Sequence, residues 1–302
     1  MKNQKAIVVY LDNNDTCEEE FTWLYKTWLL YSLENEYDLV VYHHPDAINR
    51  ANKFVGIVKI EMPPIRLSRV YKFLNSHYFC LDEWSEPLKK YKYILKTDCD
   101  VFLTENIKGY TPYKFCVGQG GYYQQTETEK FDYIRSLSKR LNLQHNNMSL
   151  IGASFYGKAD EVIEIVKNQA NITEFIISEI IKEDEFKKVG FHGGIASMIA
   201  GEIVINFAFS NQHVNLYTLD TKCWESTKIG GDVIHIHAWH SYGEWSKHQY
   251  FKGEYKDWEV TFEDAFKNAA NYCQWIANLS YSDLFYYKEK YTKGELKIDY
   301  DL

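Results

Sequence analysis

The sequence contains few prolines, no excess of basic residues and no long apolar run. These shortages argue against an interdomain linker, a nucleic-acid-binding surface and a membrane span, respectively. With five prolines in 302 residues, nothing marks a linker, so we expect a single domain over residues 1–302. The 34 basic residues are outnumbered by 42 acidic ones, and the net charge of −8 argues against a nucleic-acid-binding surface. The longest weakly charged stretch, residues 193–209, is short for a membrane span and contains Glu202, so we expect a buried helix there.

The six cysteines are scattered, and no two are spaced as a C-x-x-C pair. This spacing predicts neither a zinc knuckle nor a dense disulfide framework. The apolar run at residues 6–11 is too short for the core of a signal peptide. We therefore expect reduced thiols and a cytoplasmic protein.

Short β-rich runs alternate with segments of helical periodicity in the first third of the chain. Alternating strands and helices predict an α/β fold with a mainly parallel sheet flanked by helices. The second half has a more mixed pattern. The expected strands are residues 6–11, 38–43, 55–60, 91–97, 114–117 and 149–156, and the expected helices are residues 17–33, 66–75, 126–141 and 158–167.

Two aspartates, Asp98 and Asp100, directly follow the strand expected at residues 91–97. A D-x-D triplet alone is weak evidence, since residues 299–301 form another. The first triplet differs because apolar residues on both sides fix its carboxylates at a strand end. Ligands of open α/β sheets bind beyond the carboxyl ends of strands, where Asp12 is also expected. Carboxylates placed there can hold Mn²⁺ or Mg²⁺, and such a cation can bridge the phosphates of a diphosphate.

Residues 93–102, Tyr-Ile-Leu-Lys-Thr-Asp-Cys-Asp-Val-Phe, resemble the D-x-D strand of GT-A-fold glycosyltransferases. The resemblance implies a Rossmann-like half that binds a nucleotide-sugar, by preference a UDP-sugar, together with Mn²⁺ or Mg²⁺. It implies that Asp98 faces the sugar and ribose in catalysis while Asp100 reaches the metal. The implied reaction moves a hexose to a hydroxyl group of a glycan, protein or small-molecule acceptor.

The same resemblance divides the domain into a donor half at residues 1–104, an acceptor half at residues 105–250 and an aromatic-rich helical extension at residues 251–302. Arg69 and Lys96 are the basic residues of the donor half best placed to reach phosphates. The residues expected to contact the nucleotide-sugar are Leu11, Asp12, Arg69, Lys96, Asp98 and Asp100.

Three histidines lie between residues 235 and 240. Alternation along a strand puts His235 and His237 on one face, where either imidazole could complete a metal site with the two aspartates. In glycogenin-like transferases a late histidine is the third metal ligand, and this segment is similar. It departs from that pattern in having Ala238 in place of glycine and no Lys-Pro-Trp sequence, so both histidines remain candidates.

Glu202 is the only charged residue in the stretch 193–209. A carboxylate there needs a partner or a function, because burial of an unpaired charge is unfavourable. Asn206 follows one helical turn later and forms a polar stripe with it. The segment resembles an acidic stretch that GT-A enzymes place beneath the sugars. The resemblance implies that Glu202 is the general base of an inverting reaction or orients the donor sugar in a retaining one. The alternative is a buried glutamate bound to the backbone or to a basic side chain.

Three further residues are expected, with Asn206, to contact the acceptor or the sugar. Gly152 and Ala153 lack bulk, so a sugar could approach the backbone closely, as on the glycine-containing acceptor-side strand of the GT-A fold. Trp239 belongs to a tryptophan-rich segment that could form a wall against a sugar face. Ordinary packing explains these features equally well.

Two other classes of function remain open. A sugar-nucleotide pyrophosphorylase or a metal phosphohydrolase would also place paired aspartates at strand ends. The pyrophosphorylase, however, should have a glycine-rich basic loop where residues 12–16 are acidic. A non-catalytic carbohydrate-binding protein would keep the aromatic residues but has no need for Asp98, Asp100 and Glu202 together.

Overall fold

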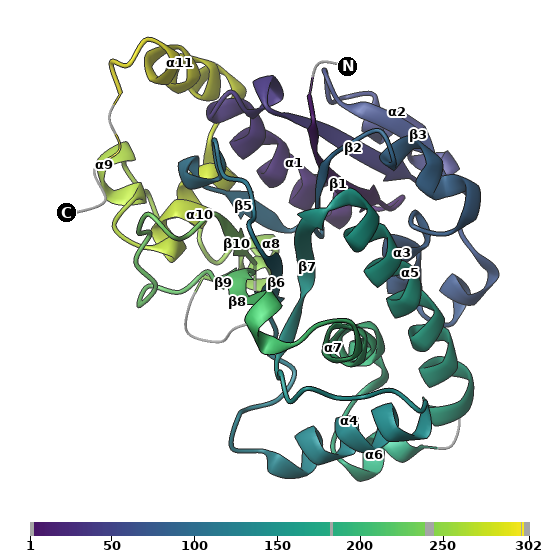
Figure 1. The fold of residues 1–302 in the computed structure, drawn as a ribbon. Helices are drawn as coiled ribbons and strands as arrows, with labels where there is room; N and C mark the ends of the chain where they lie inside the picture. Colours follow the sequence, from purple (N-terminus) through teal and green to yellow (C-terminus); the bar gives the residue numbers. More distant parts are fainter. Residues whose placement is uncertain (1–2, 182–183, 239–244, 297, 299–302) are drawn as a thin grey trace.

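The computed structural model describes residues 3–181, 184–238, 245–296 and 298, which include two β-sheets (Figure 1). In order across the larger sheet, the strands are β3 (Val58–Glu61), β2 (Tyr37–His43), β1 (Lys5–Leu11), β4 (Tyr93–Lys96), β7 (Ile151–Lys158), β6 (Phe115–Gln119) and β8 (Val214–Leu219). The smaller sheet consists of β5 (Val101–Leu103), β10 (His235–His237) and β9 (Thr221–Lys222).

Most neighbouring strands of the larger sheet are parallel. Strand β7 differs, since it runs antiparallel to both β4 and β6. The order β3-β2-β1-β4 is Rossmann-like, because the strand order changes direction between β1 and β4. The predicted α/β class is therefore confirmed, with a mixed but mostly parallel sheet flanked by helices.

Helices cover both faces of the larger sheet (Figure 1). The α-helices of the described residues are α1 (Asp15–Leu30), α2 (Ile48–Ala51), α3 (Asn75–Tyr78), α4 (Thr128–Arg140), α5 (Ala159–Phe175), α6 (Glu185–Lys188), α7 (Ala196–Ala208), α8 (Lys247–Phe251), α9 (Phe262–Ala265), α10 (Ala269–Asn278) and α11 (Tyr281–Thr292). Ile7 and Val9 of β1 share a core with α1 and α10, whereas Ala6 and Val8 share a core with α5. Strand β1 is apolar along its length because both of its faces are buried.

Helix α1 is anchored at both ends. The Asn14 side chain accepts a hydrogen bond from the Cys17 N–H at 2.7 Å and caps the start of the helix. Near the other end, the buried Lys26 ammonium donates to the carbonyls of Ile276 and Ala277 in the last turn of α10. Burial lowers the pKa of Lys26 to about 8. Carbonyls at the end of α10 thus attach it to the first helix of the chain.

The helix predicted at residues 66–75 is wrong. The chain forms two short 3₁₀ turns there, η3 (Arg66–Arg69) and η4 (Lys72–Leu74), separated by Tyr71 with φ −136° and ψ 91°. Tyr71 is buried, and its hydroxyl donates to the Gly194 carbonyl at 2.9 Å. Placing this ring against the start of α7 interrupts the helical backbone.

The apolar stretch at residues 193–209 behaves as predicted. It forms α7, which is buried along most of its length. Within the described part of the chain, no helix is long and apolar enough to cross a membrane.

Candidate metal centre

The triplet Asp98 to Asp100 leaves the larger sheet beside the end of β1. Strands β1 and β4 pair in parallel, with Val8 opposite Lys96, and the Thr97 N–H donates to the Val8 carbonyl at 3.1 Å. The aspartates therefore stand at the carboxyl end of β4, next to the strand end that precedes Asp12. The shared sheet edge predicted for these acidic residues is present.

The smaller sheet brings a histidine to this edge. After Asp100 the chain enters β5, which pairs antiparallel with β10 so that His237 lies opposite Val101. The Ala238 N–H also donates to the Asp100 carbonyl at 2.9 Å. As a result, ligand atoms of Asp98, Asp100 and His237 all lie within 4.8 Å of one another.

The His237 ring connects two carboxylates. Its Nε2 lies 3.2 Å from Oδ2 of Asp100, and its Nδ1 lies 3.3 Å from Oδ1 of Asp220. Burial lowers the pKa of His237, but Asp100 and Asp220 outweigh burial and raise that pKa well above its usual value. The ring is therefore positively charged between the two acids at neutral pH.

A lysine provides a second positive charge. The Nζ of Lys247 lies 2.5 Å from Oδ2 of Asp100 and 3.0 Å from Oε1 of Glu20 on α1. Burial raises the pKa of Asp100, but Lys247 and His237 outweigh it and hold that pKa well below its usual value. Burial and the Asp100 charge raise the pKa of Glu20 to about 7. Asp100 is thus ionised and faces two cationic side chains.

His235 has a different environment from His237. It is fully buried, its Nδ1 accepts a hydrogen bond from the Asp220 N–H at 3.0 Å, and its Nε2 lies 2.8 Å from Oγ1 of Thr97. Since Nδ1 accepts, Nε2 carries the proton and donates to Thr97. Burial lowers the pKa of His235 to about 4. Both nitrogens of this neutral ring bond to the protein, so His237 rather than His235 joins the aspartates.

Asp220 supports the site through its contact with Nδ1 of His237. It has φ 55°, a left-handed conformation that aspartate tolerates better than most residues, and its carboxylate is completely buried. The Ser154 N–H and hydroxyl donate to this carboxylate at 2.9 and 2.6 Å. A Cβ added at Gly118 or Gly152 would stand 1.7 or 2.4 Å from its Oδ2. Gly152, expected to approach a sugar, instead makes room for Asp220.

Lys96 contacts both Asp98 and the backbone of Ala153. The buried Lys96 ammonium is 3.3 Å from Oδ1 of Asp98 and donates to the Ala153 carbonyl at 2.9 Å. About a third of the Asp98 side chain is exposed, which makes it the more accessible carboxylate of the triplet. Lys96 thus holds Asp98 in place.

The other residues expected to contact a nucleotide-sugar lie in three settings. Leu11 is buried in the core between β1 and α1. Asp12 is half-exposed and accepts a hydrogen bond from the Asn13 N–H at 2.9 Å. Arg69 is exposed on η3. Trp239 lies outside the described residues.

Glu202 and Asn206 face the protein interior. The fully buried Glu202 carboxylate accepts hydrogen bonds from Tyr122 and, at 3.0 Å, from Tyr123. Burial raises the pKa of Glu202 to about 7, although both tyrosines oppose the shift. The Asn206 amide pairs with the backbone N–H and carbonyl of Met148, each at 2.8 Å. This environment matches the alternative of a buried glutamate satisfied by the protein, with tyrosines as its partners.

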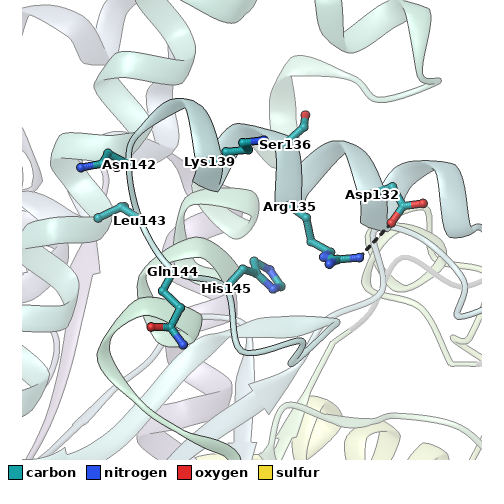
Figure 2. Close-up of a pocket in the computed structure, with 8 residues that line it drawn as sticks. All are labelled: Asp132, Arg135, Ser136, Lys139, Asn142, Leu143, Gln144 and His145. Atoms are coloured by element: carbon teal, nitrogen blue, oxygen red, sulfur yellow. Dashed lines mark hydrogen bonds and ion pairs between the residues drawn. The ribbon is translucent and has the colours of Figure 1, made fainter.

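Two hollows in the surface lie outside this cluster. One, of about 590 Å³, lies beside α4, and Figure 2 shows Arg135 directed toward Asp132, with His145 on the following loop also lining the hollow. The other, of about 520 Å³, lies between the start of α1 and residues 250–256. The lining of neither hollow includes Asp98, Asp100 or His237.

Sequence reasoning missed three residues of the site, namely Glu20, Asp220 and Lys247. Lys247 follows Trp245 and Ser246 in the segment that lacks a Lys-Pro-Trp sequence, and its charge is the available signal. Glu20 and Asp220 carry no local signal, because their roles depend on pairing between distant segments.

A model of one protein family matches residues 1–287, and the family is described as a domain of unknown function (DUF7164). A search of curated proteins finds no match to the chain.

Proposed function

The chain belongs to the DUF7164 family, and we propose that it is a metal-dependent glycosyltransferase. In this proposal it transfers a hexose from a nucleotide-sugar, first of all a UDP-sugar, to an acceptor hydroxyl group. The observation that carries the proposal is the gathering of Asp98, Asp100 and His237 beyond β4 of a Rossmann-like sheet.

The donor set fits a divalent cation. Two carboxylate oxygens suit Mg²⁺ and Mn²⁺ alike, and the imidazole nitrogen favours Mn²⁺ of the two. Asp98, Asp100 and His237 would hold it. When bound, the cation supplies a Lewis acid that neutralises the departing nucleoside diphosphate. His237 and Lys247 place positive charge beside Asp100, so binding of the cation would require His237 to release its proton and offer the Nε2 lone pair.

The surrounding residues have distinct tasks in this proposal. Asp220 binds Nδ1 of His237 and so turns Nε2 toward the aspartates, the arrangement that a metal-bound histidine needs. Lys247 supplies a further positive charge for a phosphate group. Asp98, the more exposed aspartate, faces the donor sugar, and Lys96 fixes its orientation.

The test is a screen of nucleotide-sugars for Mn²⁺-stimulated release of the nucleoside diphosphate, beginning with UDP-sugars. We expect Asp100→Asn to lower this release by about a hundredfold or more, because a Lewis-acid cation contributes several kcal/mol. Asp301→Asn, in the second D-x-D triplet of the sequence, is the matched control and should keep full activity.

Undiminished release by the Asp100→Asn protein, with a wild-type circular dichroism spectrum, would contradict the metal site. Release of inorganic phosphate from phosphomonoesters would instead assign a phosphohydrolase. Formation of sugar 1-phosphate from UDP-sugar and pyrophosphate would assign a pyrophosphorylase.

A further inference from the structure

The hollow between the start of α1 and residues 250–256 combines aromatic and polar side chains. Its volume of about 520 Å³ lies within the range of about 300–1,000 Å³ that is typical of small-ligand pockets. Tyr250, Phe251 and Tyr255 supply aromatic rings to the lining, whereas the start of α1 and the end of α10 supply polar residues. Aromatic rings together with a few polar groups are the usual composition of a pocket that binds a small molecule.

We propose that this hollow binds a neutral sugar residue of a glycan acceptor, beside the centre at which transfer takes place. The inference rests on the proposed function, because it names the class of acceptor for that reaction. The binding itself depends on the hollow alone, so it can be measured without a donor or a metal.

Buried tryptophans hold two of the aromatic rings in place. Phe251 lies almost parallel to the fully buried Trp23, with 5.7 Å between the ring centroids and 20° between the planes, yet it is 39% exposed. One face of the Phe251 ring is therefore packed, and the other is accessible. Tyr255 lies in the same way against the buried Trp245, at 6.3 Å and 22°. Rings fixed in advance lose little conformational freedom when a ligand stacks on them.

A pyranose ring matches this lining in both of its chemical parts. Its faces present C–H groups, which pack against an aromatic ring such as Phe251. Its hydroxyl groups each donate and accept hydrogen bonds, and Glu19 and Asn278 of the lining offer oxygens that accept. The Asn278 amide donates one N–H to the Gln274 carbonyl at 3.0 Å, and it has a second N–H and an oxygen for a ligand.

The charges around the hollow nearly cancel, which favours a neutral ligand. Asp15, Glu19 and Lys256 are the charged residues of the lining. Arg50 forms an ion pair with Asp15 at 2.7 Å and offsets the charge of that acid. A cationic ligand among the aromatic rings would therefore meet little net negative charge, and an anionic ligand would meet two carboxylates. A sugar without ionisable groups avoids both difficulties.

Two helices connect the hollow to the metal centre. Helix α8 begins at Lys247, which contacts Asp100, and ends at Phe251, which lines the hollow. Its five residues span roughly 6–8 Å, at about 1.5 Å per residue. On α1, Glu20 contacts Lys247, while its neighbour Glu19 lines the hollow. A glycan that fills the hollow with one sugar residue can therefore reach the centre with the next.

The experiment is saturation-transfer NMR of the full chain, without nucleotide or metal, against single sugars. The probes are the methyl pyranosides of glucose, galactose, mannose and N-acetylglucosamine, with glucosamine and glucuronate as their cationic and anionic counterparts. We expect at least one neutral glycoside to bind with a dissociation constant on the order of 1 mM, and neither charged sugar to bind as tightly. Saturation should be strongest for the C–H protons on one face of the bound ring, because that face lies against an aromatic side chain.

Matched variants locate the binding. Phe251→Ala should lower the affinity by about tenfold, because the stacking surface is lost, whereas Phe251→Trp should retain binding. Asn278→Ala, at an exposed position, leaves the core intact and should weaken binding several-fold. Phe285→Ala removes a 54% exposed aromatic ring of α11 outside the lining and should bind as the wild type does.

Three outcomes overturn the subsite. They are no binding of any neutral glycoside, tighter binding of a charged sugar, and wild-type affinity in both Phe251→Ala and Asn278→Ala. Release of nucleoside diphosphate without sugar binding leaves the proposed function standing and removes only the subsite. Sugar binding by a protein that releases no nucleoside diphosphate from any nucleotide-sugar refutes the proposed function and, with it, the description of the sugar as an acceptor.

Discussion

Replacing Glu202 with glutamine tests whether the buried carboxyl group is neutral in the folded protein. Burial raises its pKa from 4.5 to about 7, while Tyr122, Tyr123 and the Ile151 N–H oppose the shift by donating hydrogen bonds. Glutamine preserves the shape of the side chain but cannot ionise. The Glu202→Gln variant therefore removes one titration and keeps the packing.

The sign and size of the effect follow from linkage between protonation and folding. A group whose pKa is raised in the folded state gives stability that is fully present below its unfolded pKa and is lost as the pH rises through its folded pKa. For Glu202 this window runs from pH 4.5 to about pH 7. Each pKa unit corresponds to about 1.4 kcal/mol, so the wild-type protein should lose roughly 3 kcal/mol relative to the variant across the window.

Urea unfolding of both proteins between pH 4.5 and 8 measures the difference in their free energies of unfolding. Titrations elsewhere in the protein cancel in this difference. Glu129→Gln, at an exposed position of α4, controls for the loss of a carboxyl group as such. A difference that stays constant with pH, or that moves in favour of the wild type as the pH rises, would refute the reasoning. The carboxylate would then be ionised in the folded protein and stabilised by the two tyrosines.

His237→Ala should lower the Mn²⁺ affinity measured by calorimetry by at least about tenfold. His235→Ala should mainly lower the melting temperature, because the His235 ring is buried and makes two hydrogen bonds. Equal losses of affinity in both variants would contradict the assignment of the ligand. Asp220→Asn should weaken Mn²⁺ binding by about tenfold to a hundredfold through loss of its contact with Nδ1 of His237, and unchanged affinity would remove its positioning role. Gly118→Ala should lower the free energy of unfolding by about 1–3 kcal/mol or more, because its Cβ would meet the Asp220 carboxylate, while Gly231→Ala, which enters open space, should have little effect. Equal stability of these two variants in urea would show that the pocket around Asp220 is not tightly packed.

The parts of the fold that depend on local pattern could be predicted from the sequence. The apolar run that becomes β1 is buried on both faces, and the strand before Asp98 is followed by charged residues that leave the sheet. In both cases the hydrophobic pattern of a few consecutive residues decides the structure. The helix predicted at residues 66–75 was wrong for the opposite reason. The conformation of Tyr71 depends on its hydrogen bond to Gly194, which lies 123 residues away in the chain.

Some residues of the candidate site could likewise be predicted from local sequence, and others could not. Asp98 and Asp100 were predictable because a strand end places them side by side. The choice between His235 and His237 was not, because alternation puts both on one face and only the contacts of Asp220 and Thr97 distinguish them. Glu202 was correctly expected to be buried and unusual, but nothing in its helix indicates the tyrosines that bind it.

The pairing of β5 with β10 joins two proposed metal ligands, Asp100 and His237, that are 137 residues apart in the chain. At about 5–20 residues per second, a ribosome completes His237 roughly 7–27 s after Asp100, so the nascent chain carries an incomplete set of ligands during that interval. If the proposed site binds its cation, binding is a late event that favours only chains whose smaller sheet has closed. In the proposed metal site, separation of these two three-residue strands would take His237 away from the aspartates while the seven-stranded sheet stays intact. Loss of the cation should therefore precede global unfolding.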